Sequence, residues 1–317
     1  MALQADVEFM LAQLATLGAP KFSTLTPAEA RAAMAKLGEM GQQLAGPPSA
    51  DVRTEDRRIP TAAGDIPVRV YTPKASASAP AGPLPGLVFF HGGGWVVGSV
   101  AAYELECRDI AQKAECVVVS VDYRLAPEHK FPAAVDDSLA ATRWVAAHTA
   151  ELGIDAARLA VGGDSAGGNL AAVVAQQLRG EVPLVCQLLI YPATDSLNAY
   201  PSQREPDVGL LTQSDTAWFL GHYLNSPEEH KDPRMSPLLA ASLADLPRAI
   251  VAVCEYDPLR DQGVAYAEAL TAAGVPTEKL YFAGHVHGFM SLAPVVPSAR
   301  TAQDELLAAF RSALYSA

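Results

Sequence analysis

The chain has 317 residues, of which 50% are hydrophobic and 18% are charged. This composition excludes a disordered protein, because so apolar a chain buries enough surface to offset its conformational entropy. The 23 basic and 35 acidic residues give a net charge of −12, which disfavours nucleic acid, anionic membranes and polyanionic substrates as partners.

Residues 1 to about 45 predict two helices. An apolar stripe at helical spacing marks the first helix and comprises Val7, Met10, Leu11, Leu14 and Leu17. The second helix begins after Thr26, because the segment TPAE combines a capping box with proline at the first helical position. Loops rich in Pro, Ala, Ser and Gly follow at 46–50 and 74–85, and two short strands that turn at Gly64 lie between them.

From residue 84 onward, apolar runs alternate with longer amphipathic stretches. The apolar runs predict strands over 84–90, 116–123, 158–163, 184–191, 249–256 and 278–284. The amphipathic stretches predict helices over 103–115, 132–151, 166–179, 261–273 and 298–315. Because the strands are apolar without alternation, we expect both faces of their sheet to be buried. The fold class is therefore α/β, with a mostly parallel central sheet flanked by helices.

One interval interrupts this alternation. Residues 192–247 are rich in Pro, Ser and Asp, and they contain a helical segment over 211–224. An interval of this length is too long to be a simple connection between two strands of a sheet. We interpret the interval as an inserted cap.

The cysteines and the N-terminus predict a cytoplasmic protein. The N-terminal residues MALQADVEFM carry acidic side chains where a secretory signal carries basic ones, and no apolar run approaches the length of a membrane span. No C-x-x-C pair or zinc-ligand spacing occurs, so we expect four reduced and mostly buried thiols at Cys107, Cys116, Cys186 and Cys254.

A candidate nucleophile lies in the segment GDSAG (163–167). It fits G-x-S-x-G between a predicted strand and a predicted helix, where the small flanking residues allow a tight turn. Such a turn exposes the Ser165 hydroxyl at the carboxyl edge of the sheet, and the N-terminus of the next helix favours negative charge there. The alternative is a merely structural glycine turn.

A second motif, HGGGW (91–95), directly follows the strand predicted over 84–90. Three consecutive glycines permit close backbone approach and leave amides exposed, as an oxyanion hole requires. We assign the amides of Gly93, Gly94 and Ala166 as the donors. A phosphate-binding loop is the alternative, but neither G-K-[ST] nor G-x-G-x-x-G spacing is present.

A serine nucleophile needs a base that a carboxylate orients. In this fold the three residues are expected along the chain in the order serine, acid, histidine. The acid then follows the strand predicted over 249–256, where Asp257 is favoured over Glu255 and Asp261. The base follows the strand predicted over 278–284, where His285 and His287 are equally placed. The pair could also ligate a metal, although a third ligand at convincing spacing is missing.

Six stretches in order resemble the hormone-sensitive-lipase-like family of α/β-hydrolase carboxylesterases, also called bacterial family IV. They are HGGGW (91–95), DYRLAPEHKFPAAVDD (122–137), GDSAGGNLA (163–171), YP (191–192), DPLRDQG (257–263) and YFAGHVHGF (281–289). The resemblance implies that Ser165 is the nucleophile, Asp257 the acid and His287, the histidine followed by Gly-Phe, the base. It also implies an oxyanion hole of the three assigned amides, and neither a cofactor nor a metal.

The resemblance further implies an α/β-hydrolase with a helical cap. We expect a catalytic domain over 51–191 and 248–317, and a cap built from 1–50 and 192–247. Candidate substrate-pocket residues are Trp95, Trp218, Phe219 and Tyr223, although the last three fit a core within the cap equally well.

These observations predict a serine carboxylesterase that hydrolyses short- to medium-chain acyl esters. The substrate is a small ester, and the protein is a monomer or a homodimer that binds neither nucleic acid nor membranes. An amide or N-acyl hydrolase with the same triad is the nearest alternative. A non-catalytic ligand receptor, like the plant gibberellin receptors that lack the histidine, is a remote one.

Overall fold

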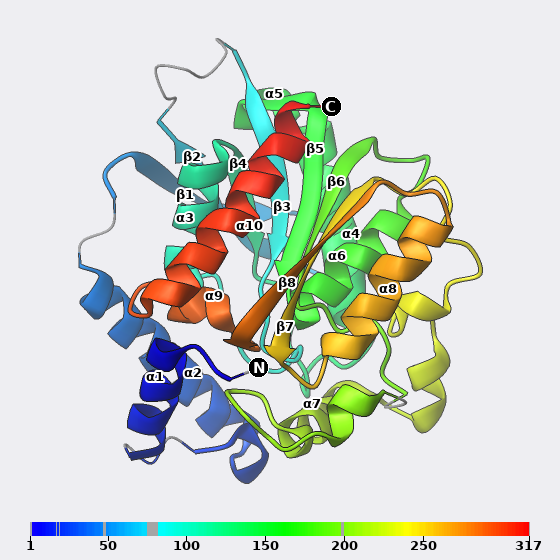
Figure 1. Cartoon of the computed structure of the whole chain (residues 1–317). Helices are drawn as coiled ribbons and strands as arrows, with labels where there is room; N and C mark the ends of the chain where they lie inside the picture. The colour runs from blue at the N-terminus through cyan, green and yellow to red at the C-terminus, as the bar shows by residue number, and fades with distance from the viewer. Residues whose placement is uncertain are drawn as a thin grey trace.

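One eight-stranded sheet forms the centre of the molecule (Figure 1). The computed structural model describes residues 2–16, 18, 20–46, 49–74, 82–197 and 200–316. The strand order is β1-β2-β4-β3-β5-β6-β7-β8. The strands are β1 (Val52–Ile59), β2 (Ile66–Pro73), β3 (Leu84–Phe90), β4 (Val117–Val121), β5 (Ile154–Asp164), β6 (Leu184–Ile190), β7 (Arg248–Tyr256) and β8 (Thr277–Val286).

Helices cover both faces of this sheet, as Figure 1 shows. One face carries α3 (Glu104–Ala114) and α10 (Pro297–Tyr315), with the short α9 (Phe289–Leu292) beside α10. The other face carries α4 (Ala133–Ala147), α6 (Ala166–Gln177) and α8 (Arg260–Ala272), and the short α5 (Thr149–Leu152) follows α4. This arrangement confirms the predicted α/β class.

The sheet is mostly parallel, as predicted. Strands β3 to β8 pair in parallel, whereas β1 pairs with β2 and β2 with β4 in antiparallel register. Successive β3 side chains enter opposite cores: Val88 and Phe90 pack towards α4 and α6, and Leu87 and Phe89 pack towards α3 and α10. Burial on both faces explains why the strand sequences show no polar alternation.

The remaining elements lie near the carboxyl ends of the parallel strands (Figure 1). They are α1 (Ala5–Thr16), η1 (Phe22–Thr24), α2 (Pro27–Ala45), η2 (Pro201–Arg204), α7 (Gln213–Tyr223), η3 (Pro227–Lys231) and η4 (Pro237–Leu239). Both parts of the predicted capping box at Thr26 and Glu29 are present. Leu17, placed in the first apolar stripe, and residues 75–81 of the second predicted loop lie outside the described residues.

Two element boundaries differ from the predictions by four residues, whereas the other boundaries from residue 84 onward agree within two. The helix predicted over 132–151 ends at Ala147, because the His148 imidazole bonds to the Trp144 carbonyl and stacks on its ring, and the backbone leaves the helical region. Strand β5 begins four residues earlier than predicted, since its first residues are partly exposed and do not form an apolar run.

All four cysteines are buried and free, as predicted. None of the helices in the described ranges combines the length and hydropathy needed to cross a membrane.

Candidate active site

Ser165 lies in a strained turn between β5 and α6. Its backbone adopts φ 54° and ψ −116°, which an L-residue rarely occupies, and its N–H donates to the Ile190 carbonyl over 2.8 Å. The flanking positions tolerate only glycine, because a Cβ on either Gly163 or Gly167 would overlap the Phe90 carbonyl. The crossing of strand and helix at this turn therefore dictates the small residues of the G-x-S-x-G motif.

The structure brings three predicted residues from three loops into one hydrogen-bonded chain. His287 Nε2 lies 2.9 Å from Ser165 Oγ, and His287 Nδ1 lies 2.8 Å from Asp257 Oδ2. Asp257 directly follows β7, and His287 directly follows β8. Because an ionised carboxylate only accepts hydrogen bonds, Nδ1 carries the imidazole proton and Nε2 is free to accept one from the serine.

Burial strengthens this chain of contacts. The Asp257 side chain is 0% exposed and the His287 side chain 10%, so water screens their interaction poorly. The second carboxylate oxygen of Asp257 accepts the Leu259 N–H over 2.7 Å, which fixes the orientation of the carboxylate. The ring of Tyr191 packs against the imidazole at a centroid distance of 4.6 Å.

The competing carboxylates lie elsewhere. Asp261 accepts hydrogen bonds from the Ser202 N–H and from Arg260, and Glu255 accepts the Gly284 N–H. Asp261 thus connects α8 to η2 and makes no contact with the imidazole.

The competing histidine is also removed from the serine. His285 is buried against Phe282 and Phe289, and burial lowers the pKa of its imidazole. Its Nδ1 has no hydrogen-bond partner among the described residues. Across the same residues, no group of three His, Cys, Asp or Glu side chains is close enough to hold a metal ion.

The glycine loop, HGGGW (91–95), presents free backbone amides beside the hydrogen-bonded Ser165–His287–Asp257 chain. Gly93 and Gly94 adopt φ 112° and 58°, which glycine alone occupies at little cost. The N–H groups of Gly93, Gly94 and Ala166 donate to no acceptor among the described residues. Ala166 is the first residue of α6, where the helix leaves its amides unpaired. These amides match the predicted donor set, and their role remains a prediction.

Asp164 joins the glycine loop to the serine turn. Its Oδ1 accepts the Gly92 N–H over 2.7 Å and its Oδ2 accepts the Tyr103 hydroxyl over 3.1 Å. Burial raises the pKa of Asp164 to about 6, against the lowering effect of these hydrogen bonds. His91 supports the same loop, because the Tyr123 hydroxyl donates to its carbonyl over 2.7 Å. Tyr103 lies outside every motif that the sequence analysis singled out, and its partner Asp164 is 61 residues away; Tyr123 lies within the stretch DYRLAPEHKFPAAVDD, although no role was assigned to it.

The four candidate pocket residues form aromatic contacts between the glycine loop and α7. Trp95 and Tyr223 stack with centroids 4.5 Å apart, and both are almost completely buried. Phe219 lies against Gly94 so closely that a Cβ on this glycine would overlap its ring, and Trp218 packs edge-on against Phe219. Phe219 therefore lies directly against Gly94, and the pocket role of all four remains a prediction.

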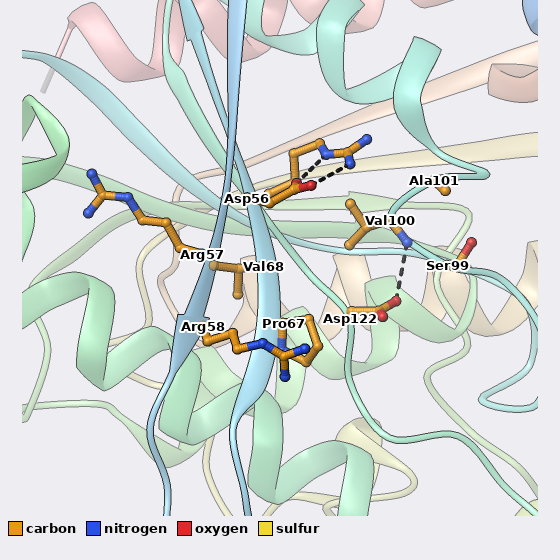
Figure 2. Close-up of a pocket in the computed structure, with 10 residues that line it drawn as sticks. Asp56, Arg57, Arg58, Pro67, Val68, Ser99, Val100, Ala101 and Asp122 are labelled. Atoms are coloured by element: carbon orange, nitrogen blue, oxygen red, sulfur yellow. Dashed lines mark hydrogen bonds and ion pairs between the residues drawn. The ribbon is translucent and has the colours of Figure 1, made fainter.

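A separate surface hollow lies away from these residues (Figure 2). It has a volume of about 520 Å³, and its lining includes Asp56, Arg57, Arg58, Arg69 and Asp122. Two of its arginines are neutralised, since Arg69 pairs with Asp56 and with a glutamate of α3, and Arg57 pairs with two further glutamates. None of the predicted catalytic residues lines this hollow, so its size carries no information about the triad.

Comparison with known proteins gives consistent matches over most of the chain. The family model for the alpha/beta hydrolase fold matches residues 87–291. Esterase LipI of Mycobacterium tuberculosis is 45% identical over 84% of this chain and 83% of its own length. An ethyl acetate hydrolase of Pseudomonas putida is 39% identical over 94% of this chain and 95% of its own. The hyperthermophilic esterase of the archaeon Pyrobaculum calidifontis superposes with a TM-score of 0.91 at 39% identity, covering 98% of this chain and 99% of the other.

Proposed function

Because the chain belongs to the hormone-sensitive-lipase-like family of α/β hydrolases and is a carboxylic ester hydrolase, we propose that it cleaves short- to medium-chain acyl esters through Ser165, His287 and Asp257. The observation that carries this proposal is the hydrogen-bonded chain from Ser165 Oγ through His287 to Asp257, beside three free amides. Each element has a distinct chemical task.

The reaction proceeds in two halves. His287 Nε2 takes the hydroxyl proton as Ser165 Oγ attacks the ester carbonyl, and the free amides of Gly93, Gly94 and Ala166 stabilise the oxyanion. The imidazolium then protonates the departing alcohol, which leaves an acyl-serine. In the second half His287 deprotonates a water molecule that attacks the acyl-serine, and the collapse returns the proton to Ser165 and releases the carboxylic acid. Asp257 holds the imidazole tautomer and stabilises its cation throughout.

Replacing Asp257 with asparagine tests the role of the carboxylate. The amide can donate to His287 Nδ1 and so favour the wrong tautomer, which we expect to lower kcat by roughly 10⁴-fold. The matched control is Asp261→Asn, four residues away, whose carboxylate accepts hydrogen bonds from Ser202 and Arg260 among the residues that the structure describes. We expect the control to retain kcat within about threefold, since these part-buried hydrogen bonds act on stability rather than on chemistry. Equal losses in the two variants would contradict the assignment of Asp257.

We also propose that residues 1–50 and 192–247 together form the cap. Asp215 of α7 accepts the Ser23 N–H of η1 over 2.8 Å, and the rings of Phe22 and Phe219 lie 5.3 Å apart. These contacts join segments nearly 200 residues apart in the sequence and bring Phe219 onto Gly94. An acyl group bound at the glycine loop then has limited room beneath α7.

The cap leads to an expected substrate range. Among p-nitrophenyl esters we expect higher kcat/KM for a C4 acyl chain than for C16, because a long chain needs more room than the packed aromatic contacts around Phe219 leave. The name of the ethyl acetate hydrolase relative favours the same range. A matched anilide series separates ester from amide cleavage, and faster turnover of anilides or of C16 esters would contradict the proposed substrate class.

A further inference from the structure

One arginine of α2 contacts the residue that directly follows HGGGW (91–95) and the segment around Ala126. Arg31 Nε donates to the Val96 carbonyl over 2.8 Å, and its Nη2 donates to the Ala126 carbonyl over 2.7 Å. The same guanidinium forms a bidentate ion pair with Glu128, and this pair lowers the pKa of the Glu128 carboxyl to about 2. A guanidinium has enough donors in a fixed plane to serve all three acceptors at once.

The Val96 contact continues through two peptide groups to a predicted oxyanion donor. The carbonyl of Val96 and the N–H of Val97 belong to one planar peptide, and this N–H donates to the Gly93 carbonyl over 2.9 Å. The carbonyl of Gly93 and the free N–H of Gly94 likewise belong to one planar peptide. Arg31 is thus connected to the Gly94 amide by alternating hydrogen bonds and peptide units.

The segment at Ala126 supports the same loop from a second direction, although the Ala126 carbonyl that Arg31 contacts belongs to the peptide with Pro127 and the Ala126 N–H belongs to the preceding peptide. The Ala126 N–H donates to the Trp95 carbonyl over 2.8 Å, and the Val96 N–H in that peptide donates to the Gly93 carbonyl over 3.1 Å. Two amides therefore hold the Gly93 oxygen on one side, and the trans geometry directs the Gly94 N–H to the opposite side.

We propose that Arg31 is a positioning residue. It orients the Gly94 amide and polarises it through the Val96–Val97 and Gly93–Gly94 peptide groups. A positive charge at the start of a hydrogen-bonded chain draws electron density towards itself and makes each following N–H a stronger donor. A stronger donor stabilises the developing oxyanion more than the neutral ester, so the effect falls on the transition state. The inference rests on the proposed oxyanion role of Gly94.

Two substitutions separate the charge of Arg31 from its hydrogen bonds. Arg31→Gln keeps a side-chain donor but removes the charge, and we expect kcat to fall by about tenfold with KM unchanged within about twofold. Arg31→Lys keeps the charge without the planar fork, and we expect a kcat between those of Arg31→Gln and the wild type. The matched control is Arg143→Gln on α4, whose guanidinium forms an exposed bidentate pair with Glu181.

A second control concerns the ion pair itself. Glu128→Gln removes the partner charge but leaves both carbonyl contacts of Arg31, so we expect kcat to stay within about twofold of the wild type. A loss in Glu128→Gln as large as that in Arg31→Gln would overturn the proposal, because the ion pair and not the peptide relay would then carry the effect.

The affinity for a transition-state-like inhibitor is a measurement that a general loss of stability does not change. A trifluoromethyl ketone forms a hemiketal with Ser165 whose oxyanion resembles the transition state, and we expect Arg31→Gln to weaken its binding by the same factor as kcat/KM. Unchanged inhibitor affinity, a loss confined to KM, or an equal kcat loss in Arg143→Gln would each overturn the proposal. If the wild type did not hydrolyse esters, or if Ser165→Ala remained active, the proposed function itself would fail. If the wild type hydrolysed esters and Arg31→Gln left kcat unchanged, only the inference about Arg31 would be refuted.

Discussion

Ser165→Ala is expected to reduce kcat for a p-nitrophenyl butyrate by roughly a millionfold, close to background hydrolysis. Without the hydroxyl no acyl-enzyme can form, and His287 loses the only reacting group within 2.9 Å of its Nε2 among the described residues. The free amides can still bind and polarise an ester, so a small residual rate over water is expected. Burst and steady-state kinetics on freshly purified protein measure the loss of acyl-enzyme formation and the residual rate.

A second alanine substitution controls for the effect of losing a buried hydroxyl. Ser138 is buried on α4, where its hydroxyl donates to the Ala134 carbonyl over 2.7 Å. Ser138→Ala is expected to lower the free energy of unfolding by about 1 kcal/mol and to leave kcat unchanged. An organophosphate should label the wild type and Ser138→Ala at Ser165. Substantial turnover by Ser165→Ala, or labelling at another residue, would contradict the nucleophile assignment.

His287→Ala is expected to lower kcat by a similar factor, roughly a millionfold. Serine and histidine act as one unit, because neither the attack nor the protonation of the leaving alcohol proceeds efficiently without the base. The double variant Ser165→Ala/His287→Ala should therefore be hardly slower than either single variant. Stopped-flow or discontinuous assays at matched folded concentration measure these rates.

His285→Ala is the matched control for this substitution. His285 is two residues away and equally buried, but its ring packs against Phe282 and Phe289 and contacts neither Ser165 nor Asp257. We expect its loss to act on the free energy of unfolding through a cavity, and to leave kcat within about tenfold of the wild type. A larger kcat loss in His285→Ala than in His287→Ala would reverse the assignment of the base.

The local patterns were sufficient for most of the architecture. Apolar runs of strand length, such as 84–90, matched observed strands because a two-sided buried strand needs nearly every residue to be apolar. The capping box at Thr26 located the start of α2 to the residue, since it depends on contacts within one helical turn. Boundaries were less certain where exposed residues or a side-chain contact with the backbone decided them, as at the start of β5 and at His148.

Tertiary structure was needed wherever two candidates shared the same local pattern. His285 and His287 alternate at the end of β8, and only the packing of neighbouring loops determines which imidazole points towards Ser165. The carboxylates differ from the histidines, because the position of Asp257 directly after the strand already favoured it over Asp261; in the folded chain Asp257 meets the imidazole, while Asp261 connects α8 to η2.

The sequence by itself determined the α/β class, the helical start at Thr26 and the candidate nucleophile, because each depends on periodicity or on a few consecutive residues. Only the folded chain decided the partners that lie far apart in sequence. Arg31 is the clearest case: nothing near it in the sequence signals a role, and its contacts to Val96 and Ala126 exist because α2 packs on the glycine loop. Local order follows from short-range sterics and burial, whereas the aim of a backbone amide depends on hydrogen bonds that long-range packing creates.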